Sequence, residues 1–203
     1  MQLFILGATG QTGTALVDLA LGRGHHVTAF VRSPHKLAPR DRLAVIQGDP
    51  HDADSLAAAL AGHDAVLSAL GTRGFANFRP HTLVADCAAS TVAAMERARV
   101  RRLLLVSAAV LFPLRGAQYA FFRWFLQHVA RDLAAAEATV APSPLDWTVV
   151  RPPRLVGGDG PYRASVAALP EQARPVSRAA VAAFMMDAVE QHAHLREVVG
   201  VAR

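Results

Sequence analysis

The chain has 203 residues, of which 52% are hydrophobic and 18% are charged, a balance typical of a globular protein and not of a disordered segment. Its formal net charge is +5, but Lys36 is the only lysine and the arginines are dispersed, so no basic block favours a nucleic-acid partner. No apolar run reaches the roughly 20 residues that span a bilayer, and the single cysteine, Cys87, excludes an internal disulfide and a cysteine-based zinc site.

Short apolar runs alternate with helix-length amphipathic stretches, the pattern of βαβ units around a mostly parallel sheet. We therefore predict an α/β fold of the doubly wound Rossmann type, with helices on both faces of the sheet, as a single domain over residues 1–203. Loops at 71–80, 107–118 and 152–164 are expected at the carboxyl edge of the sheet, where open α/β sheets bind ligands. In chain order, strands are predicted at 2–6, 26–31, 43–47, 64–69, 102–106, 146–151 and 196–201, and helices near 11–23, 53–61, 80–98, 118–139 and 177–192.

The chain starts directly with an apolar strand, without the basic segment and small-residue cleavage site of a secretory leader, which predicts a cytoplasmic protein. Its histidines are dispersed without metal-ligand spacing, so we expect no metal. We expect a monomer or a homodimer that binds neither membrane nor nucleic acid.

A glycine turn follows the first predicted strand and opens the first predicted helix, as a dinucleotide-binding fingerprint requires. Gly7 permits the tight turn, Gly10 lets the backbone approach a pyrophosphate, and Gly13 lets helix and strand pack closely. The helix N-terminus then faces the phosphates. An ordinary strand-to-helix turn that happens to use glycine is the alternative. The cofactor contacts expected here are Gly7, Thr9, Gly10, Gln11, Thr12 and Gly13.

The end of the second strand indicates which dinucleotide binds. NAD-selective sites usually carry an acid at this point, to accept hydrogen bonds from the ribose 2′-hydroxyl. Here no acid is present, and Arg32 can pair with a 2′-phosphate in a forked geometry, joined by Ser33 and Lys36. A solvated basic loop is the alternative. We favour NADP(H) as the cofactor.

The ends of the third and fourth strands extend the predicted site. Asp49 lies where the adenine would bind and can accept from its amino group, or it can cap the next helix in competition with His51-Asp52. The segment Leu70-Gly71-Thr72-Arg73 follows the fourth strand, where a small residue would let the nicotinamide ribose pass.

These segments together resemble the atypical short-chain dehydrogenase/reductase group along the length of the chain. The likeness is greatest to the NAD(P)H-binding flavin reductase / biliverdin-IXβ reductase type, with NmrA-like proteins as neighbours. Such proteins pass a hydride from NADPH to flat acceptors, while some NmrA-like relatives bind the cofactor without known turnover. The resemblance rests on Gly7–Gly13, Val31-Arg32, Gly48-Asp49, Leu70-Gly71-Thr72-Arg73, Val106-Ser107-Ala108 and Val150-Arg151-Pro152-Pro153.

The resemblance also implies site residues in the second half of the chain. Residues around Leu105, Val106 and Ser107 would line the nicotinamide, and Ser107 matches the serine that ends the fifth strand in the reductases. Pro153 is a further expected cofactor contact. Those reductases place a histidine directly after a Pro-Pro pair, but here Pro153 is followed by Arg154. A guanidinium stays protonated and cannot donate a proton as imidazole does, although Arg154 can still bind an anionic group of an acceptor.

Residues 112–125 are rich in aromatic side chains that would suit a wall for a planar acceptor. Helical spacing of three and four residues also suits a buried face, which we favour for any one of them. Phe112 and Tyr119, which lie nearer the loop, are the better candidates for ligand contact. A Tyr119/Arg123 pair weakly matches a Tyr/Lys catalytic pair, and a fortuitous pair is the better interpretation. The loop 156–162, with Tyr162, is either a cover for an acceptor or a connector. The aromatic residues are Phe112, Tyr119, Phe121, Phe122, Trp124 and Phe125.

We therefore expect an NADPH-dependent oxidoreductase that transfers hydride to a small planar substrate such as a flavin, quinone or tetrapyrrole. In this interpretation Ser107 orients the nicotinamide or the acceptor, and Arg154 anchors an anionic group. The alternative is an NmrA-like, non-catalytic NADP(H)-binding sensor. Arg154 in the histidine position favours the sensor, and the aromatic stretch favours the enzyme.

Overall fold

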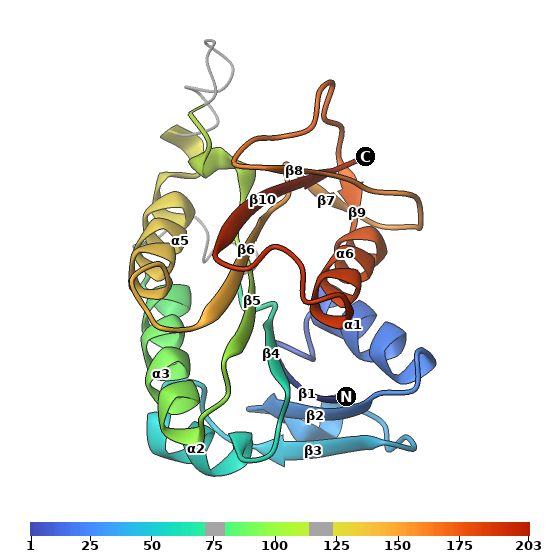
Figure 1. Cartoon of the computed structure of the whole chain (residues 1–203), viewed down its shortest axis with the longest axis vertical. Coiled ribbons are helices and arrows are strands. Elements are labelled where there is room, and N and C mark those ends of the chain that lie inside the picture. The colour runs from blue at the N-terminus through green and yellow to red at the C-terminus, as the bar shows by residue number, and fades with distance from the viewer. Residues whose placement is uncertain (72–79, 114–123) are drawn as a thin grey trace.

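The computed structural model describes residues 1–71, 80–113 and 124–203. Within this part of the chain, eight strands form one sheet in the order β3-β2-β1-β4-β5-β6-β10-β8 (Figure 1). Neighbouring strands pair in parallel except β8, which runs antiparallel to β10. The order runs outward in both directions from β1 and β4, as in a doubly wound sheet. The strands are β1 (Gln2–Leu6), β2 (His26–Val31), β3 (Leu43–Gln47), β4 (Ala65–Ser68), β5 (Arg102–Val106), β6 (Asp146–Arg151), β8 (Arg163–Val166) and β10 (Glu197–Ala202).

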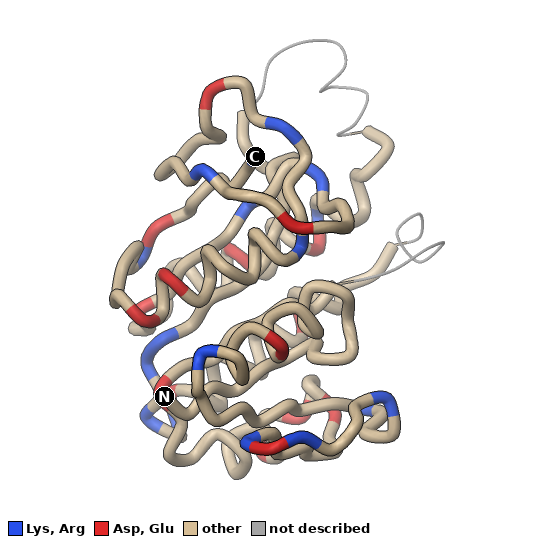
Figure 2. The backbone as a smooth tube through the Cα atoms, turned by 90° about the vertical axis from the view of Figure 1, so that its right-hand side faces the viewer, with Lys and Arg blue, Asp and Glu red and all other residues tan. Residues whose placement is uncertain are grey.

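Helices cover both faces of the sheet, which confirms the predicted fold class. Two of them, α1 and α6, pack side by side on one face, which Figure 2 turns toward the viewer. The other face carries α2, α3 and α5 (Figure 1). None of the described helices is long and apolar enough to cross a membrane. The helices are α1 (Gln11–Gly22), α2 (Ala53–Leu60), α3 (Leu83–Ala98), α5 (Gln127–Val140) and α6 (Arg178–Glu190), with 3-10 turns η1 (Pro34–Lys36) and η3 (Ala109–Leu111).

Each face of the sheet has its own apolar core because side chains alternate along a strand. In β1, Leu3 and Ile5 pack under α1 and α6, while Phe4 and Leu6 pack on the other side. Both sets are fully buried. A strand buried on both faces reads as a continuous apolar run, which is why these strands were readily predicted.

The seven predicted strands agree with the structure to within one residue at each end. The predicted helix at 80–98 starts later, at Leu83, and in place of the helix expected at 118–139 the described chain has α5 at 127–140. The sequence pattern missed the short strands β7 (Leu155–Val156), β8 and β9 (Val176–Ser177). They are too short, or in β8 too exposed, to carry a hydrophobic alternation.

Candidate functional site

A cavity of about 660 Å³ opens at the carboxyl edge of the sheet. Gly7 follows β1, Ala69 follows β4 and Ser107 follows β5, and all three line the cavity. The sheet order brings these strand ends together. The volume lies within the range of ligand pockets, roughly 300–1,000 Å³. Further lining residues are Thr9, Gly10, Gln11, Thr12, Arg32, Lys36, Pro50, Leu70, Gly71, His81, Leu83, Val84, Val106, Ala108, Leu126, Val129, Asp132, Leu133, Leu155 and Arg178.

The glycine turn forms the floor of this cavity, and two of its glycines have no room for a side chain. Gly7 has φ +77°, and a Cβ there would lie 2.7 Å from the carbonyl oxygen of Ala69. A Cβ on Gly13 would lie 2.0 Å from the carbonyl oxygen of Gly7, so α1 rests directly on the turn. The α1 N-cap, Gly10, makes no side-chain cap, and no acid stands in the first helical turn. This helix N-terminus therefore suits an anion.

Two basic side chains stand at the end of β2. Arg32 and Lys36 line the large cavity, and Arg32 also lines a smaller one of about 280 Å³ with Gly48 and Asp49. Position 48 has no room for a side chain as the structure stands, because a Cβ on Gly48 would lie 2.1 Å from Phe30 Cζ. Arg32 thus joins the two spaces, as a residue that holds the 2′-phosphate end of a dinucleotide would.

The competition for the cap of α2 is decided in favour of Asp52. Its side chain accepts hydrogen bonds from the backbone N–H groups of Asp54 and Ser55, which makes it the N-cap. Asp49 instead accepts from His51, from Nδ1 at 2.8 Å and from the backbone N–H at 3.1 Å. These hydrogen bonds lower the pKa of Asp49. The carboxylate stays ionised and exposed beside the smaller cavity.

Ser107 sits in a buried polar arrangement between β5, α5 and β6. Its hydroxyl donates to Glu137 Oε1 at 2.5 Å. Arg151 donates to both oxygens of Glu137, from Nε at 3.0 Å and from a terminal nitrogen at 2.5 Å, a forked ion pair. The guanidinium of Arg151 also lies over the Phe112 ring, 4.7 Å from its centroid. Ser107 is therefore held in one orientation at the cavity wall.

A histidine and an aspartate face each other on the same wall. His81 precedes α3, and its Nε2 lies 3.4 Å from Oδ2 of Asp132 on α5. The Asp132 carboxylate also accepts from the backbone N–H groups of Val84, at 3.1 Å, and Ala85, at 2.9 Å. Since the N-cap Thr82 makes no side-chain cap, Asp132 caps α3 from the neighbouring helix.

The geometry of the turn and of the two basic residues fits a dinucleotide. In agreement with it, the family described as NAD(P)H-binding matches residues 7–192 of the chain. The chain belongs to the NAD(P)H-binding family. The chain is therefore a Rossmann domain of the NAD(P)H-binding kind.

Relatives of this NAD(P)H-binding protein include named oxidoreductases. Oxidoreductase stcQ of Emericella nidulans is 32% identical over 224 residues, covering 96% of this chain and 80% of the relative. Oxidoreductase ptaF of Pestalotiopsis fici is 31% identical, covering 91% and 77%. An uncharacterized sugar epimerase, YhfK of Bacillus subtilis, is 29% identical, covering 82% and 78%. The family thus has oxidoreductase-like members.

Solved structures share the fold of this NAD(P)H-binding protein. The oxidoreductase ylbE from Lactococcus lactis superposes with a TM-score of 0.84 at 20% identity, covering 100% of this chain and 91% of that chain. A short-chain dehydrogenase/reductase from Veillonella parvula, solved in complex with NADP, gives 0.80 at 23% identity, covering 100% and 94%. At this identity the likeness shows the fold alone.

Some expected contacts lie away from the cavity wall of the NAD(P)H-binding protein. Leu105 points into the core under α3 and α5, because its neighbour Val106 takes the other face. Gly13 acts through packing, as described above. Ser33 and Pro153 are partly buried but do not line the cavity. Thr72 and Arg73 lie outside the described residues, so their expected contacts stay predictions.

Arg154 does not stand where an acceptor anchor was expected. Arg154 is exposed and does not line the cavity. Its backbone carbonyl accepts a hydrogen bond from the Val176 N–H, where β7 pairs with β9. Arg178, at the start of α6, is the partly buried arginine that does line the cavity.

The aromatic residues divide between core and surface. Phe112 is buried beneath Arg151, while Trp124 and Phe125 are exposed. Tyr162 does not face an acceptor: its ring packs edge-on against Phe184 and its hydroxyl donates to Asp187. The expected roles of Tyr119, Phe121, Phe122 and Arg123 fall outside the described residues.

Sequence reasoning missed His81, Asp132, Glu137 and Arg178. Glu137 is 30 residues from Ser107 and 14 from Arg151. No local spacing marks such a group, so it is recognisable only after α5 is packed against the sheet. Within the described residues, no group of three or more His, Cys, Asp or Glu side chains is arranged to hold a metal ion.

A cysteine, a histidine and an aspartate contact one another in the sequence of a nucleophilic triad: Cys87, His51 and Asp49. The Cys87 sulfur lies 3.7 Å from His51 Nε2, and His51 Nδ1 contacts Asp49. Burial raises the pKa of Cys87 to about 12, so the thiol stays protonated near neutral pH. A protonated, buried thiol is no nucleophile, so these three residues do not form a catalytic triad.

Proposed function

We propose that the chain is an NADPH-dependent oxidoreductase that transfers hydride to a flat acceptor such as a flavin, a quinone or a linear tetrapyrrole. One observation carries the proposal: the cavity does not end at the glycine turn and Ser107. It continues to an apolar wall on α3 and α5, formed by Val84, Val129 and Leu133. A protein that only held the dinucleotide would not need this second, apolar part.

The choice of NADP(H) over NAD(H) rests on Arg32 and Lys36. Both line the cavity at the end of β2, and the segment after this strand lacks the acid that would accept from a free ribose hydroxyl. The forked guanidinium of Arg32 suits a phosphate better than a lysine does. Asp49, exposed and ionised beside the smaller cavity, is then placed to accept from an adenine amino group.

The bound cofactor supplies the hydride, and the chain supplies position. A serine hydroxyl has one hydrogen, and Ser107 donates it to Glu137. Toward the cavity Ser107 therefore offers lone pairs, and it can accept from a ligand donor such as the carboxamide NH₂ of the nicotinamide. Glu137 and Arg151 hold the hydroxyl in this orientation. Apolar side chains around the acceptor exclude water.

The alternative is a non-catalytic NADP(H) sensor of the NmrA-like kind. One observation favours it: the residue after the Pro-Pro pair, Arg154, is exposed and off the cavity wall. The two functions share the cofactor site and differ at the acceptor end, so only turnover separates them.

The test is an acceptor screen run beside a binding measurement. NADPH oxidation is followed with FMN, FAD, a quinone and a linear tetrapyrrole, and the NADPH dissociation constant is measured by titration calorimetry. We expect at least one acceptor to turn over well above the rate without protein. Tight NADPH binding with background rates for all four acceptors would reject the reductase and leave the sensor.

Replacing Ser107 tests its orienting role directly. We expect Ser107→Ala to lower kcat roughly 10- to 100-fold, because misplacing the reacting groups is costly. The NADPH dissociation constant should rise less than kcat falls, by up to about tenfold, because the loss of one hydrogen bond costs up to about 1.5 kcal/mol of binding free energy. Unchanged kcat in a folded variant would remove Ser107 from the site.

A further inference from the structure

His81 and Asp132 stand on the acceptor side of the cavity, and the proposed function has not used them. His81 lies one residue before the N-cap of α3, and Asp132 lies on α5, so they reach the wall from two different elements. Asp132 is almost fully buried, with 1% of its side chain exposed, and 15% of the His81 side chain is exposed. The imidazole is thus largely enclosed, at a cavity wall, with its Nε2 3.4 Å from a carboxylate.

Few described residues on the cavity wall have a side chain suited to proton donation. The hydroxyl hydrogen of Ser107 is donated to Glu137. The guanidinium groups of Arg32 and Arg178 stay protonated. Lys36 lies at the other end of the cavity, after β2, with Arg32.

Asp132 is also unsuited to give a proton. Its carboxylate accepts from two backbone N–H groups at the start of α3, an arrangement that requires acceptor oxygens. An imidazole ring can carry and pass on a proton through a ring nitrogen. Among the described residues that line the cavity His81 is the only histidine, and the buried Asp132 carboxylate holds its ring at the wall.

We propose that His81 is the catalytic proton donor to the reduced acceptor, an inference that rests on the proposed reductase function. Hydride transfer gives the acceptor two electrons and one hydrogen and leaves it one unit more negative. A ring N–H bond of the His81 imidazolium then breaks, and an O–H bond forms on a quinone or an N–H bond on a flavin or tetrapyrrole. Solvent returns the proton to His81 after product leaves. Arg154, at the position where the resembled reductases carry histidine, is not needed for this step.

The test compares His81→Asn with a matched control, His192→Asn. His192 is exposed after α6, does not line the cavity, and has φ +49°, a conformation that Asn tolerates. We expect His81→Asn to lower kcat roughly 10²- to 10⁴-fold, the usual contribution of a general acid. The NADPH dissociation constant should change less than about twofold, and the control should match the wild type in both.

Two further readouts separate proton donation from a structural effect. In His81→Ala, added imidazole should restore part of kcat in proportion to its concentration. The solvent deuterium isotope effect on kcat should be clear in the wild type. Thermal unfolding of both variants shows whether they fold.

The outcomes separate this inference from the proposed function. Turnover by the wild type with equal kcat in a folded His81→Asn overturns the role of His81 and leaves the reductase standing. A folded His81→Ala that imidazole does not rescue also overturns it. Background rates for the wild type with all four acceptors overturn both proposals.

Discussion

At the scale of the residue, Arg32 is the side chain on which our proposal of NADP(H) over NAD(H) depends most. It stands where β2 ends, and it lines both the large cavity and the smaller one beside Asp49. A guanidinium there gains a charge-assisted, forked contact only if the ribose carries a phosphate. The free hydroxyl of NADH offers no such contact, so the energetic effect of this side chain must differ between the two cofactors.

We predict that Arg32→Ala weakens NADPH binding roughly 10- to 100-fold, as expected for one hydrogen-bonded charge pair of about 1.5–3 kcal/mol. NADH binding should change by less than about threefold. Titration calorimetry with both dinucleotides measures the two constants. Arg40→Ala, which removes only the exposed ion pair with Asp18, is the control. Equal losses for NADPH and NADH would contradict the 2′-phosphate role.

At the scale of the element, the packing of α1 on the turn after β1 keeps the glycine turn in shape. Gly13 lies in the first turn of α1, with its backbone against the backbone carbonyl oxygen of Gly7. A side chain at this position cannot be accommodated by a rotamer change. The helix would have to lift from the turn, and its free N–H groups would move with it.

We predict that Gly13→Ala lowers the free energy of unfolding by about 1–3 kcal/mol, the range for overpacked sites, and weakens NADPH binding. The clash outweighs the better helix propensity of Ala, which is worth at most about 1 kcal/mol. Urea unfolding and NADPH titration measure the two effects.

The same helix supplies the control. Gly22→Ala adds a methyl group at the other end of α1, where nothing lies within 4 Å. We expect unchanged stability or a gain of up to about 1 kcal/mol. Wild-type stability and affinity in Gly13→Ala would show that the turn tolerates a side chain.

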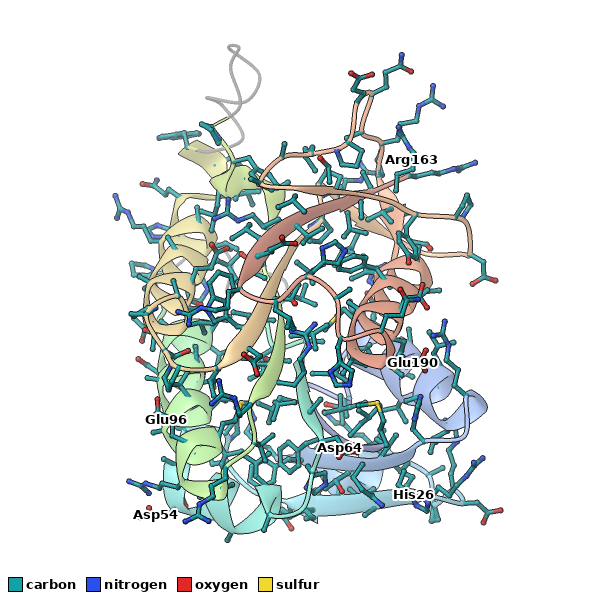
Figure 3. The ribbon with its side chains drawn as sticks, viewed as in Figure 1. His26, Asp54, Asp64, Glu96, Arg163 and Glu190 are labelled. Carbon is teal, nitrogen blue, oxygen red and sulfur yellow. The ribbon has the colours of Figure 1, made fainter. Side chains whose placement is uncertain are left out.

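At the scale of the whole molecule, a polar network joins the N-terminal βαβ unit to the C-terminal part of the chain. Arg23, after α1, forms ion pairs with Asp187 and Glu190 on α6. Figure 3 shows Glu190 at the end of α6 that lies nearest α1. Tyr162, from the loop before β8, donates to Asp187 at 2.5 Å. The network fixes α6, and with it Arg178, relative to the glycine turn.

Burial and the hydrogen bond to Asp187 raise the pKa of Tyr162 from 10.0 to about 12. The folded state therefore prefers the neutral phenol more than the unfolded state does. This contribution to stability is fully present below pH 10 and is lost as the pH rises through about 12. Cys87 acts in the same direction, because burial raises its pKa from 9.0 to about 12.

We predict that Tyr162→Phe is about 1 kcal/mol less stable than the wild type below pH 10, the value of one hydrogen bond. The difference should shrink between pH 10 and about 12, where only the wild type loses the contribution of Tyr162. Denaturant unfolding across this range measures it. Cys87 is common to both proteins and cancels in the comparison. A difference that stays constant with pH would contradict the assignment.

The sequence by itself determined the fold class and the cofactor half of the site. Strands buried on both faces appear as continuous apolar runs, and the glycine turn lies within one βαβ unit. Gly7, Gly10 and Gly13 are therefore readable from spacing alone. Arg32 follows from the same unit, because it directly ends the next strand.

Only the tertiary structure brought together the residues of the proposed acceptor half. Ser107, Glu137 and Arg151 come from three elements, and His81 meets Asp132 only because α3 packs against α5. It also removed Arg154 from the wall and put Arg178 on it. The physical reason is that contacts between distant elements depend on which face each element buries. A local sequence pattern shows which face is apolar, but it does not show which other element packs against that face.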